Sequence, residues 1–216
     1  MAKARRKFHG IQAASRAQAF VTAAAKSNFT AMRRLLADGL DINAQSSGDS
    51  ALHVAARTGR LRTAAFLIAK GADLDRFDKY RMTPLMSACV NGEVKGSQVA
   101  LMLLRAGADA TIVRPSDEMT ALKFATKRCG PEVIRALIDA GAEVDGPPGT
   151  KQTALMLAAR ANNVKAIEVL VKHGADLSLT CQLPWGEGQT AEGLAELERQ
   201  RAALDCLQQL RERKRC

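Results

Sequence analysis

The sequence is poor in aromatic residues, which make up 4% of its 216 positions and include one Trp and one Tyr. Without large rings the core has to be built from Ala, Leu, Val, Ile and Met, a set that favours helices. Long apolar runs are also absent, since the longest, such as Val99 to Leu104, have six residues. A membrane-spanning helix needs roughly 18 or more, so the sequence predicts no membrane association.

Cysteines are few and irregularly spaced. The five occur at positions 89, 129, 181, 206 and 216, and no Cys-x-x-Cys is present. This spacing argues against a zinc site and gives no sign of a disulfide framework. We therefore expect a reducing, intracellular compartment, with the cytoplasm as the simplest choice.

Acidic residues are missing from the first 37 positions, which carry eight Lys or Arg, and residues 207–216 carry four basic residues against Glu212. The remaining positions, 38–206, hold 20 basic and 21 acidic residues, so the net charge of +10 lies at the two ends of a nearly neutral body. A nucleic-acid-binding face usually spreads its positive charge over the body. Residues 1–15 are interpreted as a solvated basic tail, with a mitochondrial targeting segment as the alternative, and residues 211–216 as a second basic tail.

Catalytic signatures are absent from the sequence as well. It holds no G-x-S-x-G, no H-E-x-x-H and no P-loop, the patterns that common hydrolases, metalloproteases and nucleotide-binding enzymes share. Its three histidines, His9, His53 and His173, are far apart and suggest neither a metal site nor a triad. The sequence predicts a protein without enzymatic activity and without a cofactor.

What the sequence does contain is an internal repeat. Units that begin with Ser or Thr followed by x-Leu start at spacings of 33, 37 and 33 residues, and each closes with Gly-Ala-Asp or Gly-Ala-Glu. A degenerate copy precedes these units and another follows them. The starts are Ser50, Thr83, Thr120 and Thr153, and the closing glycines are Gly71, Gly107, Gly141 and Gly174.

Physical chemistry explains the unit that begins at Thr83. The Thr83 hydroxyl is suited to cap a helix, and Pro84 fits the first helical turn, where its missing N–H costs nothing. A second helix should end at Gly107, because glycine tolerates the left-handed conformation. This unit has three extra residues near 93–96, which predict a longer loop between its two helices. Each unit buries its apolar faces only against its neighbours, so the pattern predicts an elongated stack.

The pattern resembles the ankyrin repeat family, whose period is about 33 residues with a T-P-L-H-x-A-A start. The matching segments include SALHVAA from Ser50 and TPLMSAC from Thr83. The resemblance covers residues 16–210 and implies an all-α solenoid of helix-turn-helix units with β-turn or hairpin fingers. The repeats are expected near 16–48, 49–81, 82–118, 119–151, 152–188 and 189–210.

Members of this family usually bind other proteins with their finger tips and the exposed side of each first helix. The resemblance therefore implies a non-catalytic adaptor or scaffold, acting as a monomer or as a subunit of a larger complex. Its partner would be a protein with an acidic or mixed segment. The alternative is a small basic structural component of a ribonucleoprotein or other large assembly, which would bind nucleic acid or acidic protein through its basic ends and show salt-sensitive binding.

Carried over repeat by repeat, the family pattern also indicates contact residues. One finger holds apolar side chains where a polar turn would be usual, and the long finger before Thr190 holds Trp185, a residue type common in interface hot spots. Trp185 is expected either to contact the partner or to cover the last repeat. The finger before Thr153 adds Gly149 and Thr150. The predicted partner-binding residues are Arg57, Phe77, Lys79, Tyr80, Met82, Asn91, Arg114, Lys127, Arg128, Arg160 and Trp185.

Overall fold

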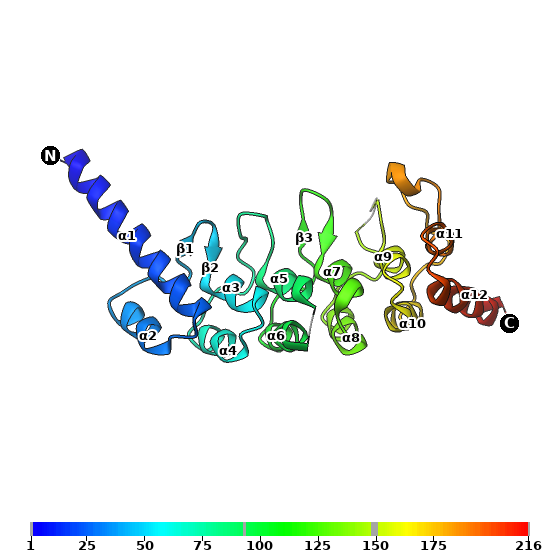
Figure 1. Cartoon of the computed structure of the whole chain (residues 1–216), viewed down its shortest axis with the longest axis horizontal. Helices are drawn as coiled ribbons and strands as arrows, with labels where there is room; N and C mark the ends of the chain where they lie inside the picture. Colours follow the sequence, from blue (N-terminus) through cyan, green and yellow to red (C-terminus); the bar gives the residue numbers. More distant parts are fainter. Residues whose placement is uncertain (1, 93, 148–150, 216) are drawn as a thin grey trace.

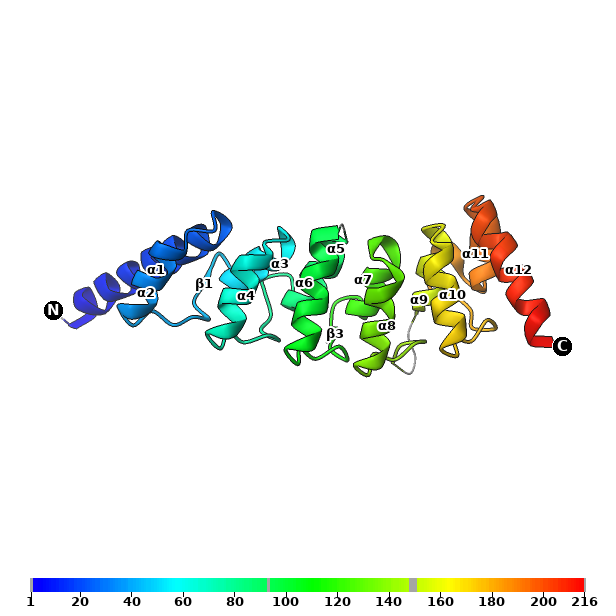
Figure 2. The same ribbon diagram turned by 90° about the horizontal axis from the view of Figure 1, so that it is seen from below.

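The protein is an elongated row of six helix pairs, with fingers projecting from one side of the row (Figures 1 and 2). The computed structural model describes residues 2–92, 94–147 and 151–215, and for 2–11 and 214–215 the backbone alone. Within these residues the first helix of each pair lies nearer the fingers and is called inner here, and the second is called outer. The inner helices are α1 (Ala2–Ala25), α3 (Ala51–Arg57), α5 (Pro84–Asn91), α7 (Ala121–Arg128), α9 (Ala154–Arg160) and α11 (Ala191–Leu197). The outer helices are α2 (Phe29–Ala37), α4 (Leu61–Ala69), α6 (Val94–Arg105), α8 (Pro131–Asp139), α10 (Val164–Lys172) and α12 (Arg201–Arg215).

A side-chain hydroxyl caps the start of five of the inner helices. In the third pair, Thr83 Oγ1 accepts the backbone N–H of Met86 at 3.2 Å, and Pro84 is the first helical residue. The outer helix of this pair is followed by Gly107 with φ of +92°, so the predicted cap and helix end are confirmed. Each cap satisfies a donor that the helix cannot pair internally. The capping residues are Ser50, Thr83, Thr120, Thr153 and Thr190.

Two of the fingers contain short antiparallel hairpins. Strands β1 (Gln45–Ser46) and β2 (Asp49–Ser50) form the first, and β3 (Val113–Arg114) and β4 (Met119–Thr120) form the second. The long finger near the C-terminal end carries a 3₁₀ turn, η1 (Pro184–Gly186). The finger tips are therefore carried by hairpins or turns that project beyond the row of helices.

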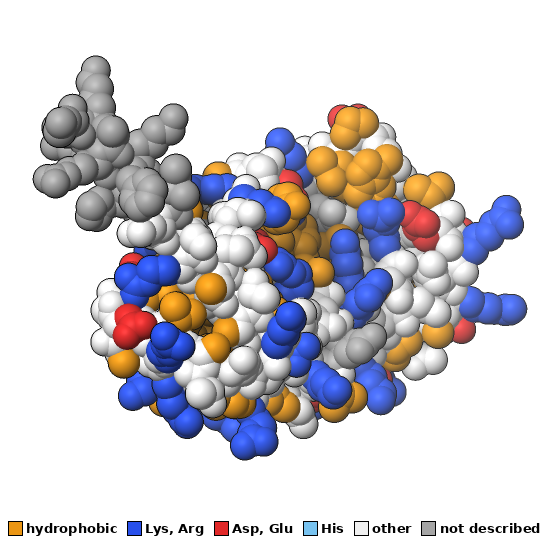
Figure 3. Space-filling model, turned by 60° about the vertical axis from the view of Figure 1, so that its left-hand side comes forward, with side chains coloured by type: hydrophobic (Ala, Val, Ile, Leu, Met, Phe, Trp, Pro, Cys, Tyr) orange, Lys and Arg blue, Asp and Glu red, His pale blue; other side chains and the backbone are white. Residues whose placement is uncertain are grey.

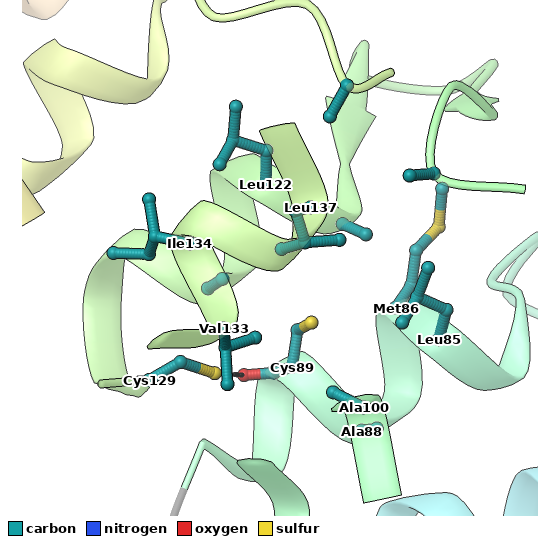
Figure 4. Close-up of a cluster of buried hydrophobic side chains, with 14 of the residues drawn as sticks. Leu85, Met86, Ala88, Cys89, Ala100, Leu122, Cys129, Val133, Ile134 and Leu137 are labelled. Carbon is teal, nitrogen blue, oxygen red and sulfur yellow. Dashed lines mark hydrogen bonds between the residues drawn. The ribbon is translucent and has the colours of Figure 1, made fainter. Parts of the chain in front are cut away.

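The core is one apolar cluster that continues from the first pair to the last, from Phe20 to Leu207. Between the third and fourth pairs, Cys89 of α5 lies beside Val133 of α8 and Cys129, and all three are buried (Figure 4). Small residues such as Ala88 on the inner helices let neighbouring pairs approach closely. Every pair therefore depends on the next for the burial of its apolar face.

Polar contacts also join successive repeats at the base of the fingers. Asn43 Oδ1 accepts the backbone N–H of Asp73 at 2.8 Å, and Asp75 Oδ1 accepts that of Asp109 at 2.9 Å. The Asp145 carboxylate accepts the N–H of Asp176 in the same way at 3.1 Å. These three contacts repeat one arrangement along the stack.

His53 links two neighbouring repeats through hydrogen bonds of its ring. Its ring is fully buried, with Nε2 3.0 Å from the carbonyl oxygen of Met82 and Nδ1 2.8 Å from the hydroxyl of Ser50. Burial lowers the pKa of His53 below its usual range, because a charged imidazole loses hydration there. The neutral ring therefore links the second repeat to the third.

The backbone differs from the sequence expectations at three places. Helix α1 begins at Ala2, so the segment 1–15 is not separate from the first repeat helix, and α12 continues to Arg215 through most of the expected C-terminal tail. The three-residue insertion near 93–96 does not lengthen a loop. It extends α6 to 12 residues against nine in α4, α8 and α10, because three residues make almost one helical turn. Glu93 itself lies outside the described residues.

Candidate functional site

The predicted contact residues fall on the fingers and on the C-terminal ends of the inner helices. Lys and Arg side chains lie around and between hydrophobic ones over the face shown in Figure 3, and acidic groups are sparser there. One position recurs seven residues after the capping residues Ser50, Thr83, Thr120 and Thr153, and we call these four residues the floor positions. They are Arg57 on α3, Val90 on α5, Lys127 on α7 and Arg160 on α9.

The finger before Thr83 is held together by Asp78, whose side chain is buried. Its Oδ1 accepts the backbone N–H groups of Tyr80 at 2.8 Å and Met82 at 2.9 Å. This geometry leaves Tyr80 59% exposed, with Lys79 Nζ 5.0 Å from the ring centroid. Phe77 is half-buried, and the Arg81 guanidinium lies over its ring at 4.4 Å. Tyr80 is thus presented to solvent from a turn that its own backbone contacts keep in place.

This finger is also fixed to its neighbour. Gln45 Nε2 in the first hairpin donates to the carbonyl oxygen of Phe77 at 2.7 Å. Gly48 has φ of +83°, and a Cβ there would lie 2.6 Å from Lys79 Cβ, so the two fingers are in close contact. A rigid finger loses little conformational entropy when a partner binds.

Arg57 belongs to the same part of the surface. Its Nη2 donates to Asp49 Oδ2 at 2.7 Å, and this hydrogen bond is the main reason that the pKa of Arg57 is raised. Asp78 and Tyr80 lie close enough to add smaller electrostatic effects. Arg57, Lys79 and Tyr80 therefore form one group at the N-terminal half of the stack.

Arg114 lies on the finger before Thr120. It forms an ion pair with Asp117 through Nε, 2.7 Å from Oδ1, and through Nη2, and its guanidinium stacks over Phe124 at 5.1 Å. The hydrogen bond from Arg114 lowers the pKa of Asp117. The Arg114 side chain is only 18% exposed, so much of it serves to hold the finger against α7.

Asn91 and Arg128 lie at a different edge of the stack. A Cβ on Gly92 would be 2.2 Å from Arg128 Cβ, and one on Gly59 would be 3.2 Å from Asn91 Nδ2. Both residues thus pack on the inter-helix turn of the preceding repeat. There Arg128 borders a hollow of about 470 Å³, away from the fingers. The lining residues are Gly92, Val94, Ser97, Gln98, Leu101, Arg128, Gly130 and Glu132.

Arg160 and Trp185 meet at the C-terminal half of the stack. The Arg160 guanidinium carbon lies 3.9 Å from the Trp185 ring centroid, and Trp185 is 42% exposed. Arg160 also forms an ion pair with Glu198, directly after α11. No spacing pattern in the sequence connects Glu198 to Arg160, so sequence reasoning did not identify this contact.

Lys127 occupies the floor position between Val90 and Arg160 and is exposed. No ion pair within the described part of the chain involves its side chain. Two further predicted finger residues, Gly149 and Thr150, lie outside the described residues. The exposed predicted contact residues thus form two clusters, one around Tyr80 and one around Trp185. The floor positions Val90 and Lys127 lie between these clusters along the row.

Among the described residues no group of three or more His, Cys, Asp or Glu side chains is placed to hold a metal ion. In the same part of the chain no helix combines the length and apolar character needed to cross a bilayer.

The sequence matches a family model described as ankyrin repeats (three copies) over residues 20–114 and 95–181. Ankyrin repeat protein nuc-2 of Neurospora crassa is 28% identical over 201 residues, which cover 88% of this chain and 18% of that protein. Human neurogenic locus notch homolog protein 1 is 35% identical over 130 residues, or 60% of this chain and 5% of that protein. The chain therefore spans less than a fifth of the length of either relative.

A solved structure also resembles the fold. It is described as a predatory endopeptidase from Bdellovibrio bacteriovorus in complex with an immunity protein. One of its chains matches with a TM-score of 0.76 and 26% sequence identity, over 88% of this chain and 97% of that chain.

Proposed function

Because the chain belongs to the ankyrin repeat family, we propose that it is a non-catalytic adaptor or scaffold for a partner protein. Ankyrin repeats in general mediate protein–protein interaction. The proposed contact surface combines the finger tips with the floor positions of the inner helices. The proposed partner segment is acidic or of mixed charge and carries at least one apolar side chain.

The exposed Tyr80 ring is the observation that carries this proposal. Tyrosine, tryptophan and arginine are the residue types most often found in interface hot spots. The finger that holds Tyr80 is already ordered by Asp78 and by contacts from the first hairpin. A partner would gain contact with the ring at a small entropic cost.

Charge supports the proposed chemistry of the partner. Lys79 flanks the Tyr80 ring, Lys127 is exposed at the centre of the row, and Arg160 lies at its C-terminal end. Complementary charge steers encounter and disfavours partners of the wrong sign. A basic segment would therefore bind this surface poorly.

The solved structure of similar fold is a complex of two proteins, which supports an interaction role by analogy alone. We also propose an intracellular location. The free thiols of Cys89, Cys129 and Cys181, all buried, and of Cys206 support a reducing compartment. Mitochondrial delivery by the basic N-terminal segment remains a prediction.

Site-specific photocrosslinking tests the proposed surface. A photoreactive residue is placed at Tyr80, and a matched control is placed at Lys165, which is exposed on the outer helix α10. Both proteins are expressed in the source cells, and adducts are identified by mass spectrometry. We expect a protein adduct from position 80 that is absent from position 165. Equal adducts from both positions would argue against a binding surface formed by the fingers and inner helices.

A further inference from the structure

We propose that Arg160 and Trp185 form a carboxylate-binding site, in which Glu198 occupies the place that an acidic side chain of the partner takes. The inference rests on the proposed function, because this site is the C-terminal end of the same surface. It adds to that function the chemistry of the ligand, a carboxylate, and a residue of the protein itself, Glu198, that competes with the ligand.

Three separate elements build the site. Arg160 is the last residue of α9, Trp185 lies in the 3₁₀ turn of the long finger, and Glu198 follows α11. The finger with Trp185 is the orange segment that projects above the C-terminal end of the row in Figure 1. These elements come together only through the stacking of the fifth repeat on the sixth.

The guanidinium of Arg160 is oriented before any partner arrives. Its carbon lies 3.9 Å from the Trp185 ring centroid. Nε and Nη2 both donate to Glu198 Oε1, at 3.0 Å and 2.8 Å. A stacked guanidinium loses little further freedom when it binds a carboxylate, and its planar fork suits that group. The contact with Glu198 demonstrates that a carboxylate fits the open side of the guanidinium.

Water reaches this ion pair. The side chains of Arg160 and Glu198 are 33% and 38% exposed, and ion pairs open to solvent contribute little to stability because water screens them. Exchange of Glu198 for an external carboxylate therefore costs little. The ion pair of Arg57 is less open, because its partner Asp49 is only 13% exposed.

Lys127 supplies a second positive charge at the neighbouring floor position. Glu198 stands eight residues after its capping residue, and the corresponding residue in the repeat that follows Lys127 is Ala161, which carries no charge. Helices α7 and α9 pack side by side, and packed helices lie about 8–10 Å apart. Three residues of a polyproline II segment make one turn and span about 9 Å, so side chains at positions i and i+3 point to the same side. The ligand that fits both charges is an acidic segment in this conformation with carboxylates at positions i and i+3.

The test uses Trp185 as its own reporter, since the protein contains one Trp. Two capped peptides of identical composition are titrated into the full-length protein while Trp185 emission is recorded. One peptide carries two glutamates three residues apart in an otherwise Ala and Ser sequence, and the other carries them at adjacent positions. We expect the first peptide to change the emission and to bind more tightly than the second.

Substitutions then separate the roles of the three residues. Glu198→Gln removes the competing charge and should tighten binding of the first peptide by about fivefold, the factor that corresponds to a surface ion pair. Arg160→Gln should abolish the response. Arg160→Lys keeps the charge but loses the planar fork, so most of the affinity should be lost. Arg135→Gln, at an exposed position on the outer helix α8, is the matched control and should leave the titration unchanged. Circular dichroism melts verify that each variant is folded.

Several results would overturn the inference. One is an affinity of Glu198→Gln for the first peptide that is unchanged or weaker. Another is full binding of that peptide by folded Arg160→Gln. Equal binding of the two peptides, or no change of Trp185 emission with either, would also contradict it. Displacement of the peptide by inorganic phosphate at matched ionic strength would overturn the assignment to a carboxylate. If the crosslink from position 80 forms while Glu198→Gln has no effect, the proposed function stands and this inference fails. If Glu198→Gln tightens peptide binding while no crosslink specific to position 80 forms, the carboxylate site stands and the proposed contact surface around Tyr80 fails.

Discussion

At the scale of single residues, Tyr80 allows folding to be separated from binding. Asp78 holds the turn through the backbone N–H groups of Tyr80 and Met82, so the phenol ring is not needed for the turn to form. Tyr80 is mostly exposed, whereas Phe77, three positions earlier, is half-buried beneath Arg81. The two aromatic residues of this finger therefore differ in what their removal should affect.

We expect Tyr80→Ala to reduce affinity for the crosslinked partner by about 1–3 kcal/mol, the range of a lost hot spot. The melting temperature should be almost unchanged, because little of the ring is buried. Calorimetric titration and thermal denaturation of the same variant measure the two quantities. Phe77→Ala is the control and should lower the melting temperature. A destabilised Tyr80→Ala protein with unchanged affinity would place the binding site elsewhere.

Asp75 offers a test of the polar contacts between repeats. Burial is the largest effect on this carboxyl and raises its pKa, and the nearby Asp109 carboxylate adds to the increase. A raised folded-state pKa means that Asp75 favours the fold below its unfolded pKa of about 3.9. That contribution is lost as the pH rises through the folded-state pKa. At neutral pH the charged Asp75 carboxylate therefore slightly lowers the free energy of unfolding.

We expect Asp75→Asn to raise the melting temperature at pH 7 by about one or two degrees. The melting temperature of this variant should also differ less between pH 4 and pH 7 than that of the wild type. The amide keeps an Oδ1 acceptor for the N–H of Asp109, as Asn43 already does for Asp73. Thermal denaturation over this pH range measures both effects. Asp75→Ala, which has no acceptor, should be less stable than wild type. A less stable Asp75→Asn protein at pH 7 would show that the charge itself is needed.

At the scale of the helices, glycines with positive φ follow several helix ends, and two of them separate backbone strain from steric contact. Gly141 follows α8 with φ of +93°, and a Cβ there would meet only Thr111 Cγ2, at 3.8 Å. Gly92 follows α5 with φ of +55°, and its Cβ would be 2.2 Å from Arg128 Cβ. The first position has space for a side chain and the second does not.

We expect Gly141→Ala to cost about 1 kcal/mol of unfolding free energy, from positive φ alone. Gly92→Ala should cost more, because the neighbouring repeat must also move to avoid the contact with Arg128. Chemical denaturation of the two variants measures both free energies. If Gly141→Ala unfolds at the wild-type denaturant concentration, the helix end is not constrained as described.

Helical geometry also explains which predicted contacts the fingers share. Neighbouring residues on an α-helix point about 100° apart, since a turn takes 3.6 residues. Of the pairs Val90 with Asn91 and Lys127 with Arg128, only one member can face the fingers. Asn91 and Arg128 pack instead on the preceding repeat. The repeat register indicated Asn91, Lys127 and Arg128 alike, but the packing between repeats separates Lys127 from the other two.

At the scale of the whole molecule, the net positive charge lies at the two ends of the chain, and the apolar core lies between the stacked helix pairs. The first side chain described as buried is Ala17, and Arg16 donates from Nη2 to the carbonyl oxygen of Asp38 at 2.8 Å. Residues 12–15 are exposed. Loss of the segment before Arg16 therefore removes none of the buried side chains described here.

We expect removal of residues 1–15 to change the melting temperature by only about one or two degrees. Binding to acidic partners should weaken, and the loss should be largest at low salt because counterions screen the charges at high salt. Thermal denaturation and binding at two ionic strengths measure these effects. A large loss of stability would show that the segment packs on the first repeat, and a salt-independent loss of binding would exclude an electrostatic role.

The sequence by itself determined the repeat, the helix caps and the closing glycines, because these depend on short-range chemistry. Thr83 caps its helix and Gly107 ends the next one whatever lies beyond them. The sequence also located Tyr80 and Trp185 on fingers, since both stand where turn residues are usual. Such local rules need only the order of residues within one repeat.

Only the tertiary structure decided how residues of different repeats meet. It turned an inserted segment into an extra turn of α6 and placed Arg128 away from the fingers. It also brought Glu198 to Arg160, 38 positions earlier. The physical reason is that each repeat completes its surface with side chains from the next. Their meeting depends on helix packing and side-chain direction, which the repeat register does not specify.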